Sequence, residues 1–299
     1  MERPMNWTTE QENTLTRDID KLPTLEALQL INREDAQVAA AVAAELPDIA
    51  RAVEMIVAAL ETGGRLFYVG AGTSGRLGML DAAECVPTFS APPELVQGLI
   101  AGGAEAMLRS IEGAEDDLAA GATDLRARQL SSADVVCGIA ASGRTPYTIG
   151  ALDYARSIGA RSISIACNRD SPMAARADVI ISVDVGPEVI AGSTRLKAGT
   201  AQKMILNMLS TASMIGLGKV YGNLMVDVKV TNAKLLRRAV GLVMRLTSLD
   251  EAAARQLLEA AKREVKTAVV MQQRSVNYAR ARQLLAENNG RLRGVVGDL

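Results

Sequence analysis

The sequence predicts an α/β protein built around a five-stranded, parallel, doubly wound sheet flanked by helices. Five short runs rich in valine and isoleucine, apolar on both faces, alternate with helical stretches, which is typical of strands buried in a parallel sheet. Two turns rich in glycine and hydroxyl residues directly follow two of these runs. The strands are expected at residues 66–69, 95–100, 135–140, 162–166 and 179–183.

Helical periodicity occupies the rest of the chain. Residues 25–60 alternate apolar and polar positions at helical spacing, which predicts two or three helices. A methionine-rich helix is expected at 197–216, with its methionines in the core or at a subunit interface. Helix-like segments at 250–262, 264–273 and 277–285 predict a small helical domain. We expect an N-terminal helical segment (1–60), a sheet domain (61–245) and a C-terminal helical domain (246–299).

The composition narrows the class of protein. With 33 basic and 34 acidic residues, the chain carries no net field that would attract nucleic acid or an anionic membrane. The first seven residues hold no apolar signal core, and polar residues interrupt the longest apolar stretch, 204–218, so no membrane segment is expected. Cys85, Cys137 and Cys167 are scattered without metal spacing, which favours a reduced, cytoplasmic protein.

The chain contains no histidine. This removes the commonest general base, the nucleophile pairs that depend on histidine, and most zinc sites. Carboxylates are therefore the expected agents of any proton transfer near neutral pH. No metal and no cofactor is predicted.

A first phosphate cradle is expected at residues 70–76, Gly-Ala-Gly-Thr-Ser-Gly-Arg. A strand that turns directly into a helix leaves backbone N–H groups unpaired at the positive end of the helix dipole, which suits an anion. The nucleotide fingerprints fail, because no acidic residue closes the next strand and no Gly-Lys-Ser/Thr follows. Thr73, Ser74 and Gly75 indicate a neutral grip on a small phosphate ester; a tight turn without ligand is the alternative.

A second cradle is expected after the third strand, at residues 138–146. Ser142 and Thr145 supply hydroxyls, Gly143 permits close backbone approach, and Pro146 suits the first turn of a helix. Ligands of open α/β sheets bind outside the carboxyl ends of the strands, near the point where strand order reverses. The two cradles are therefore expected to converge on one phosphorylated ligand, with two unrelated turns as the alternative.

Glu84 and Glu115 each end a series of apolar residues spaced three and four positions apart. On a helix such a series lies along one face, and a carboxylate held against apolar surface resists ionisation, which suits proton transfer. The alternative is that each glutamate sits at a helix end near Pro87 or Gly113 and reaches water. The series are Leu77, Leu80, Glu84 and Leu108, Ile111, Glu115.

A third polar segment runs from Glu188 to the start of the methionine-rich helix at Lys197. Serine, threonine and basic residues at a helix start either cap it or contact a phosphate or sugar hydroxyl, and the sequence leaves both possibilities open. Arg76, Arg144 and Lys197 are the candidate counter-charges for the phosphate, with ordinary surface solvation as the alternative for each.

Five blocks of this sequence together resemble the N-acetylmuramic acid 6-phosphate etherase family of the sugar isomerase (SIS) superfamily, which is similar to glucokinase regulatory protein. The resemblance implies an SIS sheet with a C-terminal domain like a ubiquitin-associated fold. The blocks are residues 70–85, 112–116, 138–146, 197–203 and 221–227.

The resemblance implies a lyase that cleaves the D-lactyl ether of N-acetylmuramate 6-phosphate in cell-wall recycling, by elimination of D-lactate followed by hydration. It implies Glu84 and Glu115 as the catalytic pair, with Glu84 as the acid at the departing oxygen and Glu115 as the base at C2. It implies that Glu188 assists ring opening. The implied substrate contacts are Thr73, Ser74, Gly75, Glu112, Ser142, Gly143, Thr145, Glu188 and Lys197.

Two other functions use the same parts of the sequence. A sugar-phosphate sensor needs the two cradles but not the glutamates, and an aldose-ketose isomerase would use Glu188 as its base. Product analysis separates the three functions. A homodimer is expected, with the methionine-rich helix as a credible interface.

Overall fold

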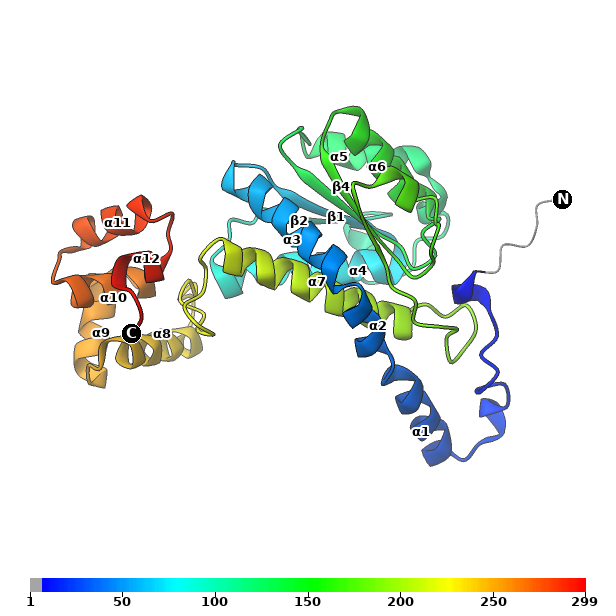
Figure 1. Cartoon of the computed structure of the whole chain (residues 1–299), viewed down its shortest axis with the longest axis horizontal. Coiled ribbons are helices and arrows are strands. Elements are labelled where there is room, and N and C mark those ends of the chain that lie inside the picture. Colours follow the sequence, from blue (N-terminus) through cyan, green and yellow to red (C-terminus); the bar gives the residue numbers. More distant parts are fainter. Residues whose placement is uncertain (1–6) are drawn as a thin grey trace. The chain divides into compact units, whose positions relative to one another are not determined.

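The structure, a computed structural model, describes residues 7–299; residues 1–6, which belong to the stretch searched for a signal core and to the predicted N-terminal segment, lie outside the described residues. The chain divides into two compact units (Figure 1). Unit 1 comprises the chain up to residue 82 and residues 94–210, and unit 2 comprises 83–93 and 211–299. The two units are defined by compactness alone and do not test the predicted division into three domains at residues 60 and 245, which stays a prediction.

Unit 1 contains the five-stranded parallel sheet, which confirms the predicted fold class. The strand order is β2-β1-β3-β4-β5. Each predicted strand is present within one or two residues of its expected ends. Their bounds are β1 Leu66–Gly70, β2 Val96–Ile100, β3 Val135–Ile139, β4 Arg161–Ala166 and β5 Val179–Ser182.

The strand order reverses between β1 and β3. Strand β1 pairs with β2 on one side and with β3 on the other, and Gly70 at its end is in register with Ile139 at the end of β3. The loops that follow these two strands therefore leave the same edge of the sheet side by side. This is the position where open α/β sheets bind ligands.

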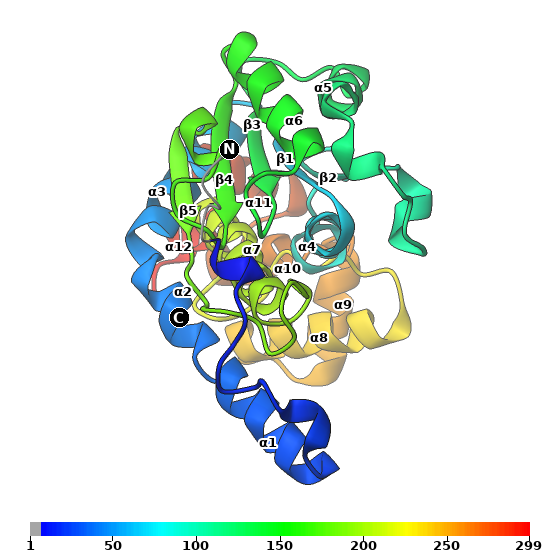
Figure 2. The same ribbon diagram turned by 90° about the vertical axis from the view of Figure 1, so that its right-hand side faces the viewer.

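Helices cover both faces of the sheet. Phe67 and Val69 pack in one core cluster with α5 and α6, whereas Tyr68, between them, contacts α4 on the opposite face. Figures 1 and 2 show α5 and α6 on one side of the strands and α3 on the other. The helices of unit 1 are α1 Thr24–Asp35, α2 Val38–Ala44, α3 Leu46–Glu61, α5 Leu118–Ala127 and α6 Pro146–Ser157, together with the unit 1 parts of α4 Gly72–Phe89 and α7 Lys197–Gly216.

Unit 2 has its own apolar core, formed by α8 to α12 and the segment before α8. The three helices predicted for the C-terminal domain are present as α9 Glu251–Ala260, α10 Val265–Arg274 and α11 Tyr278–Glu287. Two more helices, α8 Ala233–Thr247 and α12 Leu292–Val296, pack with them. No helix in the described part of the chain is long and apolar enough to cross a membrane.

One ionisable group lies inside the packing of α4 and α7 against β1. Asp81 accepts a hydrogen bond from Ser210 Oγ at 3.0 Å and interacts with the Tyr68 hydroxyl. Burial raises the pKa of Asp81 to about 6, although Ser210, Tyr68 and the charge of Lys203 act in the opposite direction.

We predict that Asp81→Asn stabilises the protein at pH 7.5. Because the pKa is higher in the folded state (about 6) than its ordinary value of 3.8, this group opposes folding increasingly as pH rises from about 4 to 6 and fully above that. The variant should gain about 1–3 kcal/mol at pH 7.5 and progressively less as pH falls toward 4. Urea unfolding at several pH values measures this, with the exposed Asp116→Asn as control; a variant less stable than wild type throughout contradicts it.

Candidate active site

The first cradle is formed by the turn between β1 and α4. Ser74 and Gly75 are buried and Thr73 is half-buried, at the start of α4. A Cβ atom at Gly75 would lie 2.6 Å from the Gly70 carbonyl oxygen and 2.7 Å from Ile100 Cγ1. Only glycine fits at this position, so the backbone turns as tightly as the sequence predicted.

The second cradle is the turn between β3 and α6. Gly143 has a φ of +67°, and a Cβ atom there would lie 2.3 Å from Ser171 Cβ. The Arg144 amide donates to Ser142 Oγ at 3.2 Å. Buried Asn168, which follows β4, donates from Nδ2 to the carbonyl oxygens of Ala141 and Ser142, each at 3.3 Å. The loop is therefore held in shape from behind.

The start of α6 is left open for an anion. Thr145 is the N-cap residue of this 12-residue helix, and its side chain makes no capping hydrogen bond. Pro146 occupies the first turn, where its missing N–H costs nothing. The following N–H groups have no partner within the helix, so an anion held by the Ser142–Thr145 loop can accept from them.

The start of α7, in contrast, is capped from inside the protein. The Lys197 amide donates to Glu188 Oε2 and the Ala198 amide to Glu188 Oε1, both at 2.9 Å. Glu188 is only 1% exposed. Burial raises the pKa of Glu188, and the two N–H groups and the Lys197 charge offset part of that rise. In this structure Glu188 is the cap of α7; contact with a ligand stays a prediction.

The Lys197 side chain forms a buried ion pair. Its Nζ lies 2.7 Å from Glu34 Oε2, with the two side chains 1% and 5% exposed, and Asn13 Nδ2 donates to the same oxygen at 2.7 Å. Burial by itself would raise the pKa of Glu34, but the bonds from Lys197 and Asn13 outweigh it and lower the pKa. Lys197 therefore ties α7 to α1; its predicted contact with substrate stays a prediction.

The other two candidate counter-charges also have protein partners. Arg76 donates from Nε to the Ala106 carbonyl at 3.0 Å, and Arg144 stacks over Trp7 at 4.7 Å and pairs with Glu10 at 3.4 Å. Each of the three cations therefore has a structural role in the protein. This arrangement agrees with a neutral, hydrogen-bonding grip on a phosphate.

A side chain that sequence reasoning missed lies beside the first cradle. Ser74 Oγ donates to Gln202 Oε1 at 2.9 Å, joining the start of α4 to the first turns of α7. Gln202 is 1% exposed, and its amide nitrogen has no hydrogen-bond partner among the described residues. Gln202 falls within the block 197–203, which was the available signal. Asn168, also missed, follows β4 and carries no such signal.

Glu112 and Glu115 line a cavity of about 350 Å³ beside the first cradle. Ala71 and Gly72 form part of the same wall. The predicted helical stripe Leu108, Ile111, Glu115 is wrong: a 3₁₀ helix ends at Met107, another covers only 114–116, and Leu108 is 92% exposed. Gly113, at φ +71°, breaks the helix, as the alternative reading allowed. Both glutamates are exposed.

Glu84 lies on α4, twelve positions after its first residue, Gly72. At 1.5 Å per residue, about 18 Å of helix separates the two. Pro87 lies inside the helix and does not end it. Glu84 is exposed, and Leu80 on its predicted apolar stripe is 51% exposed, so this chain by itself does not cover the stripe.

Comparison with known proteins identifies the class. Residues 48–156 match the glucokinase regulatory protein N-terminal SIS domain, 117–212 the SIS domain, and 222–264 the C-terminal lid domain of glucokinase regulatory protein. Phosphoheptose isomerases from Francisella tularensis and Neisseria gonorrhoeae share the fold, with TM-scores of 0.52 and 0.51 at 18% identity, over 65% and 64% of this chain and 100% and 98% of theirs. The protein is an α/β protein of the SIS class.

Sequence relatives narrow this class to one family. N-acetylmuramic acid 6-phosphate etherases from Pectobacterium atrosepticum and Klebsiella aerogenes are 55% and 54% identical to this chain. The matches cover 95% and 97% of this chain and 94% and 97% of theirs. The chain belongs to the N-acetylmuramic acid 6-phosphate etherase family.

We predict that Lys197→Met lowers the free energy of unfolding by about 3–5 kcal/mol, because it leaves the buried Glu34 carboxylate without its cation. The double variant Glu34→Gln/Lys197→Met should recover most of that loss. Urea unfolding checks both variants, with Lys21→Met, in the exposed pair with Asp18, expected to cost no more than about 1 kcal/mol. A single variant as stable as wild type would rule out the stabilising role of the pair.

Proposed function

We infer that this chain is a carbon-oxygen lyase that cleaves the D-lactyl ether of N-acetylmuramate 6-phosphate in amino-sugar recycling. The products are N-acetylglucosamine 6-phosphate and D-lactate. Family membership at 54–55% identity over nearly the whole chain supports the reaction. One structural observation supports locating the reaction at the first cradle: Glu112 and Glu115 line the same cavity as Ala71 and Gly72 of that cradle.

We propose that the two cradles hold the phosphate with neutral donors. Hydroxyls of Thr73, Ser142 and Thr145 supply hydrogen bonds, and the uncapped start of α6 adds backbone N–H groups. The Ser74 hydroxyl joins them when its proton turns from Gln202 Oε1 to the phosphate. Gly75 and Gly143 keep the backbone close to the ligand. The buried, unpartnered amide of Gln202 is a further donor that this site can offer to the sugar.

The proposed chemistry needs one acid and one base. In the open-chain aldehyde the C2 proton lies alpha to the carbonyl, so Glu115 removes it and the C2–C3 double bond forms as the C3–O bond breaks. Glu84 protonates the departing lactate oxygen. Water then adds to C3 as the Glu84 carboxylate accepts its proton, and Glu115 returns its proton to C2, so that both residues regain their starting states. Glu188 and Lys197 contribute by fixing the start of α7, and Glu112 lines the cavity beside Glu115.

We predict that Glu84→Gln and Glu115→Gln each lower kcat by at least about 100-fold, because proton transfer by a positioned carboxylate contributes about that much. Binding of the sugar phosphate should remain within a few-fold of wild type. D-lactate release and calorimetric titration measure the two quantities, with Glu105→Gln as an exposed control. Near-normal turnover in either variant would remove that residue from the mechanism.

We further propose that the active form is a homodimer whose sites combine Glu84 of one subunit with Glu115 of the other. The length of α4 carries Glu84 away from the cradle at the start of its own helix. The leucines Leu25, Leu28 and Leu80 are 67%, 57% and 51% exposed, and apolar surface of this kind is typical of an interface between copies.

Mixing the two inactive variants tests this arrangement. If each site takes one glutamate from each subunit, half of the dimers in an equal mixture are mixed, and each has one intact site. About a quarter of wild-type activity should therefore return after subunit exchange. If both glutamates of a site belong to one chain, no mixed dimer has an intact site and the activity stays at the level of the variants.

We propose a cytoplasmic location, supported by three cysteines that are free and buried. An isomerase acting on the same cradles would yield a ketose phosphate, and a sensor would yield no product. If N-acetylmuramate 6-phosphate gave a ketose phosphate or no product, and no D-lactate, the lyase assignment would be overturned.

A further inference from the structure

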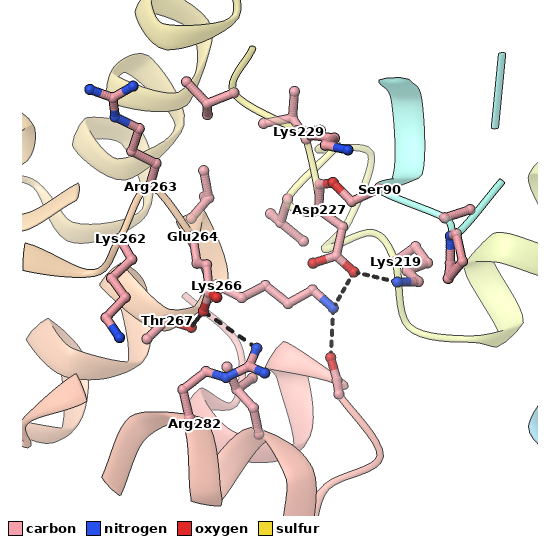
Figure 3. A pocket seen from close by; sticks show the side chains of 18 of the residues that line it. Ser90, Lys219, Asp227, Lys229, Lys262, Arg263, Glu264, Lys266, Thr267 and Arg282 are labelled. Carbon is pink, nitrogen blue, oxygen red and sulfur yellow. Dashed lines mark hydrogen bonds and ion pairs between the residues drawn. The ribbon is translucent and has the colours of Figure 1, made fainter. Parts of the chain in front are cut away.

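Unit 2 contains a pocket of about 620 Å³ that the proposed reaction does not use. Its wall comes from the segment 90–93, the segment 219–230, the residues from Lys262 to Thr267, and α11 (Figure 3). All of these segments belong to one compact unit. A pocket of this size has room for a small organic molecule. We refer to it as the basic pocket.

The charge of the basic pocket differs from that of the whole protein. Its wall has six basic and two acidic side chains, an excess of four positive charges in a chain with a net charge of −1. Figure 3 shows Lys219 and Lys229 on one side of the pocket and Lys262 and Arg263 on the other. The six basic residues are Lys219, Lys229, Lys262, Arg263, Lys266 and Arg282.

The two carboxylates do not neutralise this excess. Asp227 Oδ2 lies 2.7 Å from Lys266 Nζ and 3.3 Å from Lys219 Nζ, so one acid faces two cations. Glu264 lies 3.4 Å from Arg282. Lys229 and Lys262 have no carboxylate partner in the part of the chain that the structure describes; the Lys262 ammonium instead lies 4.4 Å from the centre of the Tyr278 ring.

The floor of the pocket is rigidly built. Lys266 Nζ donates to the carbonyl oxygens of Gly218 at 3.0 Å and Gly290 at 2.7 Å as well as to Asp227, and its side chain is 9% exposed. A buried cation with three fixed acceptors holds α10, the segment after α7 and the segment after α11 in one arrangement. The pocket therefore exists before any ligand enters.

Its rim contains unusual backbone. Lys262 and Arg263 are consecutive residues with φ of +53° and +64°, and Ser90, on the opposite wall, has φ of +49°. Non-glycine residues rarely adopt this conformation, which costs of the order of 1 kcal/mol or more and is found often at ligand sites. Here it occurs at two of the exposed cations that face the pocket.

Apart from Ser90 and Thr267, the remaining side chains of the wall are apolar. Ala91, Pro92, Pro93 and valines of the 226–230 segment offer flat, nonpolar surface, and no aromatic side chain lines the pocket. Fixed cations beside such surface suit a phosphate carried on a compact body such as a sugar, whose C–H faces pack on apolar groups. The lining has no aromatic side chain to stack on a base, so it favours the compact sugar over a nucleotide.

We propose that the basic pocket binds a small organic phosphate of sugar-phosphate size, as a second site distinct from the two cradles. Lys229 and Lys262, which lack carboxylate partners among the described residues, supply charge to the phosphate. Arg263, paired with Glu259 at 3.0 Å, and Arg282, paired with Glu264, can turn from these surface ion pairs toward it. The inference does not depend on the reaction proposed above, since it uses residues of unit 2 that have no part in that mechanism.

The test is a titration of the full-length protein with N-acetylglucosamine 6-phosphate and with glucose 1,6-bisphosphate, followed by calorimetry and by peptide-resolved hydrogen exchange. The expected result is two binding events per chain, with one protecting residues 262–267. Inorganic phosphate and AMP are titrated in parallel, to separate the contribution of the phosphate to binding from that of the rest of the ligand. If no probe, at concentrations up to about 10 mM, gives a binding event that protects residues 262–267, the proposal is overturned, whether or not the cradles bind.

A charge-matched pair of variants localises the second event. Lys229→Gln/Lys262→Gln should weaken it about tenfold or more and leave D-lactate release without added effector unchanged. The control Lys234→Gln/Arg255→Gln removes the same charge from exposed positions outside the pocket and should change affinity less than about threefold. Equal weakening in both pairs would mean diffuse surface attraction, and would also overturn the proposal.

Discussion

The architecture of the site depends on whether a protein side chain caps the unpaired N–H groups at each helix start. At α7 a buried carboxylate, Glu188, accepts from both available amides, so this helix is closed to outside anions. At α6 the N-cap Thr145 makes no such bond, although a threonine could. An anion is attracted to the helix start that the protein leaves uncapped. The reversal of strand order between β1 and β3 then places the first cradle beside this open end.

Cationic side chains fix the surroundings of the two cradles, which leaves neutral donors to hold the phosphate that we propose there. Lys197, Arg76 and Arg144 each hold a neighbouring segment: α1, the loop around Ala106, and the N-terminal residues Trp7 and Glu10. A lysine free to move to the phosphate would bind more strongly. It would also retain the product, which carries the same phosphate as the substrate. Uniform binding of this kind does not accelerate the reaction.

The sequence was sufficient for the sheet, because each strand is a short, doubly buried apolar run with no competing pattern. It was also sufficient for the two tight turns after β1 and β3, which glycine and hydroxyl residues predict, whereas the binding of a phosphate by these turns stays a prediction. The sequence failed between Leu108 and Glu115, because apolar residues spaced three and four positions apart do not by themselves specify a helix in a segment that Gly113 interrupts. It could not find Asn168 or the Glu34–Lys197 pair, because those contacts join residues more than 20 positions apart that have no local signal.

Glu84 and Glu115, the proposed acid and base of a chain without histidine, are both exposed to water. A carboxylate that moves a proton in the elimination needs surroundings from which water is excluded, and this chain provides none at either residue. The apolar stripe of α4, with Leu80 half-exposed, needs a cover as well. One event, the docking of a second copy, would satisfy both requirements and bring the two glutamates to one substrate. The catalytic environment would then be a property of the dimer, and neither the sequence pattern nor a single folded chain would contain it.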